Sequence, residues 1–593
     1  MKRTRFMWLG TLLVLTPLLG LAAMPGVSAS RGNTQSDAQY ANSYAASGVT
    51  NIVATTQKVS CYRPEAYLAT AVYPDGGMQA CNGRANTGEN IGTSPYATQA
   101  GSNPGYPASG PMLVKDHSES DIRVDTTNPN HLIASSKWFV SAEGYNHLLG
   151  FYESFDGGQT WPVQGHIPGF EGWTDNTDPV GAFDGYGNYY ELNLPYQFFY
   201  NNDGSHNYSV GGSREPNPTI PAEVISVAVR PHGATQSSQW ITTRNGQPDY
   251  IATYDSTGRE PDKQWITIDT NPNSPNYNTI YAMWVLFTGL NSAKPYVSTA
   301  RALPNGTHTN WSTPLLLPTV NGTASDTYLL PHVDPSGVVY TTEANFPSGH
   351  QFCCANISII YSSDAGQTWQ GPLPIPDAQG IAQPPYVYAN TTFRSGILQT
   401  FGVGGRLSSQ GHYPLYVSWE EASTGVSNIL LSASYDGGTT WTTPVQVNDN
   451  ISPVDELQPN LSVLPNGTVA VAFYDRRLAC PSAGTGEAQA AGLAQDPNQP
   501  YGATNYCVNT SLQFYSPTLT PRGRNIRLSA HTWDPQLNAP KVSCPTCRVT
   551  FIGDYFGIVG NGTYAFTTSV STYNYGDNPN YHQQQVVAKI SAP

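Results

Sequence analysis

The sequence predicts an all-β protein: a single β-propeller of six or seven four-stranded blades, with seven favoured, behind an irregular N-terminal extension. Three observations predict it. The 593 residues are only 11% charged but 11% aromatic, with 56 Gly and 48 Pro, a turn-rich composition unlike that of helical bundles, coiled coils or disordered chains. One octapeptide recurs three times, and short alternating strand patterns recur in seven similar units. Short strands, regular turns and no long amphipathic helix together indicate radial repetition of small sheets.

The first 29 residues have the three parts of a secretory signal peptide. A basic start precedes an apolar stretch over 6–23, and small residues at 27–29 form a cleavage site. The apolar stretch contains Pro17 and is shorter than the roughly 20 apolar residues that a membrane helix needs. We therefore expect a secreted protein with no membrane span.

Residues 30–117 are rich in Gly, Asn and Ser and show little periodicity, which predicts an irregular segment stapled by a disulfide. Eight cysteines suit an oxidising compartment. They allow 105 connectivities, so spacing only suggests pairings. The suggested pairs are Cys61 with Cys81, Cys480 with Cys507, and Cys544 with Cys547.

The repeated octapeptide is the most specific feature of the sequence. Its copies are SFDGGQTW at Ser154–Trp161, SSDAGQTW at Ser362–Trp369 and SYDGGTTW at Ser434–Trp441. The pattern predicts a hairpin turn in which the Asp accepts backbone N–H groups. The second Gly adopts a positive φ, and the Trp packs against the adjacent sheet. These residues are predicted to build a corner and to carry no chemistry.

The octapeptides belong to longer units, each with a short strand, a Gly or Asn-Pro turn and an aromatic-rich strand. Alternation of apolar residues, as at 468–473, is typical of strands. The propeller is expected over 118–593, with a long irregular insert at about 480–548. The seven units start at Ser120, Thr177, Asp262, Pro331, Tyr413, Asp455 and Phe551.

The octapeptides resemble the Asp box, or BNR repeat, of the sialidase superfamily. The larger units are similar to secreted bacterial Asp-box proteins described as sialidase-like, and the resemblance covers roughly residues 118–590. It implies a propeller, but Asp-box propellers include glycosidases and non-catalytic binding proteins. The fold does not decide between them.

A sialidase-like site needs arginines that grip a carboxylate, a Tyr nucleophile with a carboxylate base, and an acid for the leaving oxygen. The resemblance implies Tyr555 as nucleophile, Glu456 as its base, and Asp121 or Asp178 as the acid. The first inner strand has Arg123-Val124-Asp125 where sialidases have Arg-Ile-Pro. The substrate-binding candidates are Arg123, Arg394, Arg476 and Asp262.

Some of these residues also have a structural interpretation that involves no chemistry. Arg476 follows Asp475 at a strand end, where such a pair often ties adjacent blades, and Asp178 before Pro179 can cap a turn. His332 has no visible metal partner and is interpreted as structural. No metal or other cofactor is predicted.

The net charge of −14 and the absence of a basic run after the first few residues argue against nucleic acid as a partner. No nucleophile elbow, phosphate-binding glycine loop or HExxH motif occurs. The first hypothesis is a secreted sialidase-like glycoside hydrolase acting on terminal sugars of extracellular glycans. The alternative is a non-catalytic propeller that binds carbohydrate or protein outside the cell, and a cell-envelope scaffold is a third option.

Overall fold

The computed structural model describes short N-terminal segments and most of the chain from residue 116 onward. The described residues are 55–58, 63–64, 113–114 and 116–593 without 140–146, 169–174, 197–222, 255–259, 289–291, 321–324, 347–353, 386, 538–549, 577 and 580. The predicted signal peptide, the Cys61–Cys81 pair and the Cys544–Cys547 pair lie outside the described residues.

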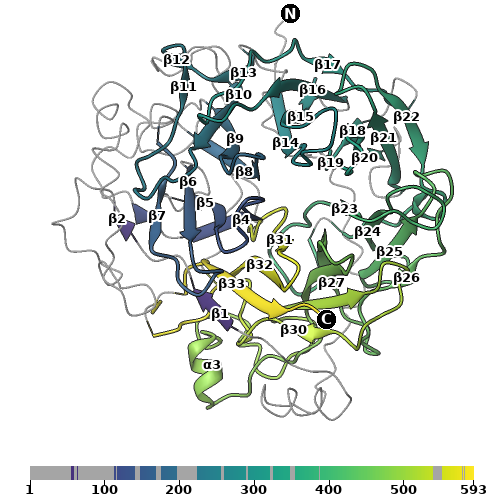
Figure 1. Ribbon diagram of the computed structural model, residues 1–593. Coiled ribbons are helices and arrows are strands. Elements are labelled where there is room, and N and C mark those ends of the chain that lie inside the picture. Colours follow the sequence, from purple (N-terminus) through teal and green to yellow (C-terminus); the bar gives the residue numbers. More distant parts are fainter. Residues whose placement is uncertain are drawn as a thin grey trace, which may run out of the picture.

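Seven antiparallel sheets stand around a central axis and form a seven-bladed β-propeller, which confirms the predicted fold class (Figure 1). The first three blades, each from its inner to its outer strand, have the following bounds. Blade 1 is β4 (Asp116–Val124), β5 (Leu132–Phe139), β6 (His147–Ser154) and β7 (Val163–His166). Blade 2 is β8 (Asp175–Phe183), β9 (Tyr189–Tyr196), β10 (Glu223–Arg230) and β13 (Tyr250–Tyr254). Blade 3 is β14 (Glu260–Ile268), β15 (Thr279–Phe287), β16 (Ala293–Arg301) and β17 (Leu315–Leu316).

The next three blades repeat this order, and blade 4 divides its inner strand in two. Blade 4 is β18 (Ser325–Thr327) and β19 (His332–Val333), then β20 (Val339–Phe346), β21 (Asn356–Ser362) and β22 (Gln370–Pro374). Blade 5 is β23 (Gln399–Val403), β24 (Leu415–Glu421), β25 (Asn428–Ser434) and β26 (Val445–Gln446). Blade 6 is β27 (Glu456–Val463), β28 (Val469–Asp475), β29 (Asn509–Tyr515) and β30 (Ile526–Arg527).

Blade 7 is closed by both ends of the chain. It contains β31 (Gly557–Gly560), β32 (Tyr564–Ser571) and β33 (Gln584–Ser591), and its outer strand is β1 (Thr55–Lys58). Strand β1 pairs antiparallel with β33, with Thr55 opposite Lys589 and Lys58 opposite Val586. The segment predicted to be irregular therefore supplies the strand that closes the ring.

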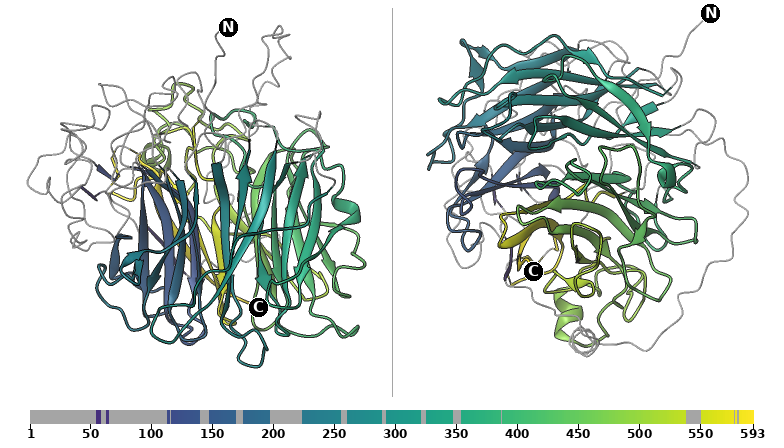
Figure 2. Two further views of the ribbon diagram at one scale, coloured as in Figure 1. Left: turned by 90° about the horizontal axis from the view of Figure 1, so that it is seen from above. Right: turned by 45° about the vertical axis from the view of Figure 1, so that its right-hand side comes forward.

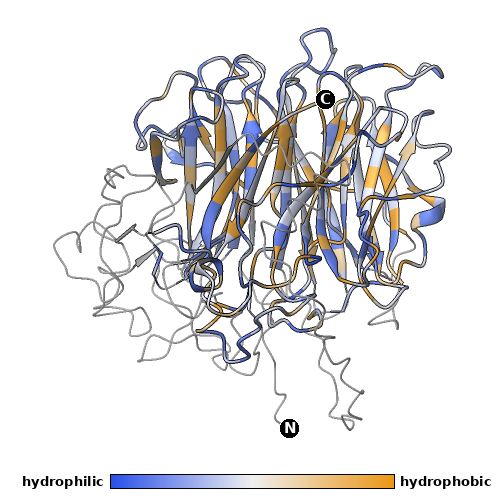
Figure 3. Ribbon diagram, turned by 90° about the horizontal axis from the view of Figure 1, so that it is seen from below, coloured by the Kyte–Doolittle hydropathy of each residue, from blue (hydrophilic) through white to orange (hydrophobic). Residues whose placement is uncertain are grey.

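The hydrophobic core lies between neighbouring blades. The second strands are largely buried because each blade packs against two others; in β15 every residue except Phe287 is buried. One core cluster joins blades 2 and 3, with Leu192 and Trp284 among its members. The strands stand side by side from one face of the ring to the other (Figure 2), and apolar residues gather along them (Figure 3).

Each octapeptide forms the turn between the third and fourth strands of its blade, which confirms its predicted structural role. In the first copy, Asp156 Oδ1 accepts the backbone N–H groups of Gln159 at 2.9 Å and Thr160 at 2.8 Å. Gly158 adopts a φ of +77°, and Trp161 is buried. The third strand runs in the same direction as the inner strand, so these turns lie on the face where the inner strands end.

The inner strands carry a bulge near their start. Pairing registers shift around Glu119, Asp178, Lys263 and Gln458. These residues have positive φ values of 45°, 55°, 54° and 50°. Tyr328, between β18 and β19, has a φ of 59°. Bulges re-aim side chains, and here they do so at one level of the ring. We call the face at which the inner strands begin the entry face.

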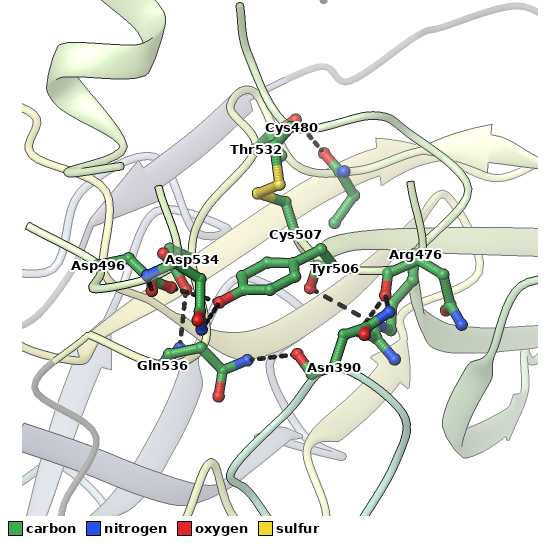
Figure 4. The surroundings of a disulfide bond; sticks show 12 residues. Asn390, Arg476, Cys480, Asp496, Tyr506, Cys507, Thr532, Asp534 and Gln536 are labelled. Atoms are coloured by element: carbon green, nitrogen blue, oxygen red, sulfur yellow. Dashed lines mark hydrogen bonds between the residues drawn. A yellow bond between two sulfur atoms is a disulfide. The ribbon is translucent and has the colours of Figure 1, made fainter. Parts of the chain in front are cut away.

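The predicted pair Cys480–Cys507 forms a disulfide, and 27 positions separate the two cysteines (Figure 4). It ties the connection between β28 and β29, which contains the short helix α3 (Gly486–Ala490). Strands β29 and β30 of blade 6 lie within the region predicted as one irregular insert at about 480–548. The disulfide-tied connection is thus an insertion inside a blade.

Candidate active site at the entry face

The inner strands surround a tunnel. Its cavity, of about 260 Å³, is lined by residues of these strands and of the segments next to them. Above it, at the level of the bulges, a cluster of charged side chains reaches across the ring. We call this group the charged cluster. Its members are Glu119, Lys137, Asp178, Asp262, Lys263, Arg394 and Asp554.

One half of the charged cluster centres on Lys137, which comes from the second strand of blade 1. Its Nζ lies 2.5 Å from Glu119 Oε2 and 3.4 Å from Asp178 Oδ1. The Lys137 ammonium also lies 5.1 Å from the centre of the Phe551 ring. All three charged side chains are at most 7% exposed. The bulges of blades 1 and 2 therefore aim two carboxyl groups at one buried cation.

The other half centres on Asp554, in the segment before β31. Its Oδ2 lies 2.7 Å from Lys263 Nζ and 2.8 Å from an Nη atom of Arg394. Lys263 Nζ also lies 3.6 Å from Asp262 and 3.9 Å from Asp178. The side chains of Lys263 and Arg394 keep 11% and 14% exposure, more than the acids around them. The two cations are thus the most accessible charges of the charged cluster.

The pKa values of the two carboxyl groups beside Lys137 are shifted in opposite directions. Burial raises the pKa of Glu119 well above its usual range, and the charge of Asp178 adds to the rise. Burial acts in the same direction on Asp178, but Lys137 and Lys263 outweigh it and lower its pKa. Both side chains lie close to the Lys137 ammonium, at 2.5 Å and 3.4 Å. The opposite shifts favour a proton on Glu119 and an ionised Asp178.

A third carboxyl group of the charged cluster titrates near neutrality. Burial raises the pKa of Asp262 to about 7, against the opposing charge of Lys263. The charges of Asp178 and Asp554 add to the rise. Groups whose pKa values are driven apart in this way can share acid and base roles.

Tyr555 contacts the segment that carries Asp178. Its hydroxyl donates to the carbonyl of Pro179 at 3.1 Å, and Trp265 meets its ring edge-on with centres 5.3 Å apart. Burial raises the pKa of Tyr555 well above its usual range, followed by the charges of Glu119 and Asp178. The phenol is therefore protonated at neutral pH and needs a neighbouring base to act as a nucleophile.

Asp121 and Arg123 lie lower, in the tunnel wall. An Nη atom of Arg123 is 3.0 Å from Asp121 Oδ1, and Arg123 Nε donates to the Gly181 carbonyl at 2.7 Å. Asp121 accepts the Gly181 N–H at 2.9 Å. The pair therefore bridges blades 1 and 2.

The structure does not bring Glu456 to Tyr555. Glu456 is fully buried in blade 6, with its Oε1 3.7 Å from Nε of Arg477. Burial and the charge of Asp475 raise the pKa of Glu456 well above its usual range. The carboxyl groups that act on Tyr555 are those of Glu119 and Asp178, followed by Asp121 and Glu191.

The three predicted arginines do not share one pocket. Arg476 is fully buried, pairs with Asp455 at 3.1 Å and donates to the Tyr506 carbonyl (Figure 4). These partners lie in blade 6, so Arg476 is structural but ties parts of one blade and not adjacent blades. Arg394 pairs with Asp554 in the charged cluster, and Arg123 with Asp121 in the tunnel. Of the predicted site residues, the structure brings together Asp178, Asp262, Arg394 and Tyr555.

Glu119, Lys137 and Lys263 belong to this site. The sequence offers Glu119 and Lys263 as charged groups at the starts of inner strands, without a specific role, and it does not single out Lys137. Glu119 and Lys263 occupy the same bulge position as Asp178, in the segments Ser-Glu-Ser-Asp, Asp-Lys-Gln-Trp and Thr-Asp-Pro-Val. Aligning the units on their inner strands places these residues at one level of the ring. The sequence gives no such signal for Lys137. It lies on the second strand of its blade, where the sequence otherwise predicts core residues.

Within the described ranges, no group of three or more His, Cys, Asp or Glu side chains is arranged to hold a metal ion. His332 lies in the tunnel wall with its ring 5.7 Å from that of Phe401. In that same part of the chain, no helix is long and apolar enough to cross a membrane.

Comparisons with known proteins add neighbours of the same general shape. No family model matches the chain, and no curated protein matches it. A sialidase of Trypanosoma rangeli in complex with the inhibitor DANA is similar at 12% identity and a TM-score of 0.34, over 81% of this chain and 56% of that chain. The polysaccharide lyase Uly1 is similar at 11% identity and a TM-score of 0.43, over 91% of this chain and 99% of that one.

An α-L-arabinanase of Penicillium chrysogenum in complex with arabinobiose is similar at 10% identity and a TM-score of 0.34, over 70% of this chain and 92% of that chain. The match to the Trypanosoma rangeli sialidase covers 56% of that chain, which is little more than half of the enzyme. Values this low do not decide activity, which depends on the site.

Proposed function

We propose that this chain is a secreted glycoside hydrolase that works at the entry face of its propeller, with Glu119 as the general acid. The observation that carries the proposal is the placement of Glu119 and Asp178 around one buried Lys137 ammonium, with their pKa values shifted in opposite directions, close to Tyr555. Cleavage of a glycosidic bond needs a proton for the leaving oxygen and a nucleophile or base on the other side. The pair supplies both protonation states in one place.

In the proposed reaction the Glu119 proton moves to the glycosidic oxygen as the bond to the anomeric carbon breaks. The Tyr555 oxygen forms a bond to that carbon, and its proton moves to Asp178. Water then hydrolyses the tyrosyl intermediate, with the protons returning to both residues. This scheme keeps Tyr555 as the predicted nucleophile and replaces Glu456 by Asp178 as its base, because Asp178 is among the carboxyl groups that act on Tyr555.

The more specific form of the proposal is that the enzyme cleaves terminal acidic sugars from glycans, as a sialidase does. It is supported by Lys263 and Arg394, the most accessible charges of the charged cluster, with exposures of 11% and 14%. A substrate carboxylate can pair with such cations through charge-assisted hydrogen bonds. Asp262 remains a proposed substrate-binding residue beside Lys263.

One observation favours the alternative, a non-catalytic propeller that binds carbohydrate. The cations of the charged cluster already have acidic partners, and Tyr555 is only 8% exposed. A binding protein needs no movable proton. It requires only that Lys263 and Arg394 present their exposed sides to a ligand.

Turnover of a panel of fluorogenic glycosides, with acidic and neutral terminal sugars, tests the choice. We expect Glu119→Gln, Asp178→Asn and Tyr555→Phe each to lower kcat by about 100-fold or more. Glu456→Gln, a matched change in a buried carboxyl group outside the charged cluster, should keep kcat within a few fold. No turnover of any glycoside, with glycan binding retained, would overturn the hydrolase and support the binding protein.

A further inference from the structure

The tunnel below the charged cluster contains polar groups that the proposed chemistry does not use. Gln399, at the start of β23, lines the cavity and is 1% exposed. Its Nε2 donates to the Tyr328 carbonyl at 2.8 Å, which fixes the amide. Its Oε1 has no hydrogen-bond partner within the described part of the chain. A buried acceptor without a partner is unfavourable, so Gln399 presents a fixed, unused acceptor at the cavity wall.

A second acceptor comes from His332 of the neighbouring blade, which also lines the cavity. Burial and the charge of Arg123 lower the pKa of His332 to about 4, and the ring hydrogen-bonds to the backbone of Phe401. A neutral imidazole has one N–H and one acceptor nitrogen. With its N–H used on the backbone, His332 keeps one nitrogen for a donor.

The wall of the cavity opposite Gln399 supplies a hydrogen-bond donor, Arg123, whose positive charge is balanced by a neighbouring carboxylate. Arg123 lines the cavity with 23% of its side chain exposed, and Asp121 beside it offsets its charge at 3.0 Å. His332 adds no charge, and Asp554, which also lines the cavity, is paired with Lys263 and Arg394. The balanced charges of the walls favour an uncharged ligand. Trp265 and Phe401 add aromatic surface to the walls.

These groups define the ligand by its chemistry. Two acceptors require hydroxyl or amide donors, Arg123 requires an acceptor, and the aromatic rings favour a molecule with an apolar face. The cavity of about 260 Å³ is close to the lower limit of small-molecule pockets, about 300 Å³. It therefore suits one small molecule and no longer chain.

We propose that the tunnel is a second binding site, below the charged cluster and adjoining it at Asp554 and Tyr555, that takes one neutral monosaccharide or polyol. Hydroxyl groups of the ligand donate to Gln399 Oε1 and to His332, and another accepts from Arg123. The site requires no turnover at the entry face, so it stands whether or not the chain is a hydrolase.

Titration calorimetry and saturation-transfer NMR on the full chain test this site with D-galactose, D-glucose, L-arabinose and myo-inositol. We expect at least one of them to bind, and Gln399→Met to weaken its affinity at least tenfold. Gln513→Met is the matched control, because Gln513 is another buried glutamine whose Nε2 donates to a backbone carbonyl, that of Phe514. It should bind like the unchanged protein.

Ser462→Phe, which fills the tunnel from β27, should abolish binding, and thermal unfolding establishes that each variant is folded. Binding of none of the four compounds at millimolar concentration would overturn the proposal. Equal binding by the Gln399 variant and by the tunnel-filling variant would also overturn it, because the ligand would then lie elsewhere.

Discussion

Five non-glycine residues with positive φ mark the level of the ring where the charged cluster lies. Such conformations cost about 1–3 kcal/mol each and persist where the surrounding structure determines them. Glu119, Asp178 and Lys263 carry their ionised or ionisable groups directly from these positions into the charged cluster. The same backbone irregularity in several blades thus aims side chains at a shared point, which straight strands would direct elsewhere.

Removal of Lys137 tests whether the charged cluster depends on its buried cation. Lys137→Met keeps the aliphatic stem but leaves Glu119 and Asp178 without the ammonium that lies 2.5 Å and 3.4 Å from them. Breaking a buried ion pair from one side costs about 3–5 kcal/mol. We expect a loss of that size in the free energy of unfolding, measured with urea.

The control for this change is Lys589→Met. Lys589 donates to the Gly157 carbonyl at 2.7 Å and is only partly buried. Among the described residues it has no buried carboxylate as partner. Its replacement should cost about 1 kcal/mol or less. Similar losses for the two variants would contradict the importance of the charged cluster.

The octapeptide turns show how one carboxylate organises a blade corner. In the third copy, Asp436 Oδ1 accepts the Thr440 N–H at 2.9 Å and the Ser434 hydroxyl at 2.8 Å, while Oδ2 accepts the Thr440 hydroxyl at 2.6 Å. The turn orders strands β25 and β26 of blade 5. Each element is small, so its stability depends on such local bonds together with packing between blades.

Asp436→Ala is expected to lower the free energy of unfolding by about 1–3 kcal/mol, because donors of the turn lose a charged acceptor. Thr439→Ala is the control in the same turn, since the Thr439 hydroxyl only donates to the Asp436 carbonyl at 3.2 Å on the exposed surface. It should change stability by less than about 0.5 kcal/mol. If Thr439→Ala lowers the free energy of unfolding as much as Asp436→Ala does, the loss arises from changing the turn in general and not from removing the carboxylate.

The closure of the whole ring depends on a strand from near the N-terminus. Without β1, strand β33 would expose its edge, and an exposed edge destabilises a sheet and invites association. A chain starting at residue 59 is therefore expected to melt several degrees lower than one starting at residue 51, which keeps β1, and to associate more readily. Differential scanning calorimetry and light scattering measure both properties. Equal melting temperatures would mean that β1 contributes nothing to closure.

Much of this architecture could be predicted from sequence, because the repeated segments form their turns and strands through local interactions. The octapeptides specify turns through their own side chains, and alternation at 468–473 specifies a strand. The charged cluster was harder to predict, since Lys137 and Asp554 meet their partners only after the ring closes. Glu456 illustrates the limit: its position at the start of an inner strand suggested the tunnel, whereas its contacts lie within blade 6.

The buried ionisable groups also predict how the whole molecule responds to pH. Burial raises the pKa of Asp262 to about 7 and that of Glu191 to about 8. These acids keep their protons when folded and lose them near pH 4 when unfolded. Folding therefore takes up protons, and stability falls as pH rises from about 4 to about 8.

His131 adds to the loss at higher pH. Although burial opposes the charge, hydrogen bonds to Asp125 and Glu153 raise its pKa to about 9, above the value of about 6.5 in an unfolded chain. Its contribution is therefore complete below about pH 6.5 and lost as pH rises through 9. We expect the free energy of unfolding in urea to be lower at pH 9 than at pH 6. Between pH 8 and pH 9 the decline should become shallower in His131→Gln, and an unchanged decline there would show that another group titrates.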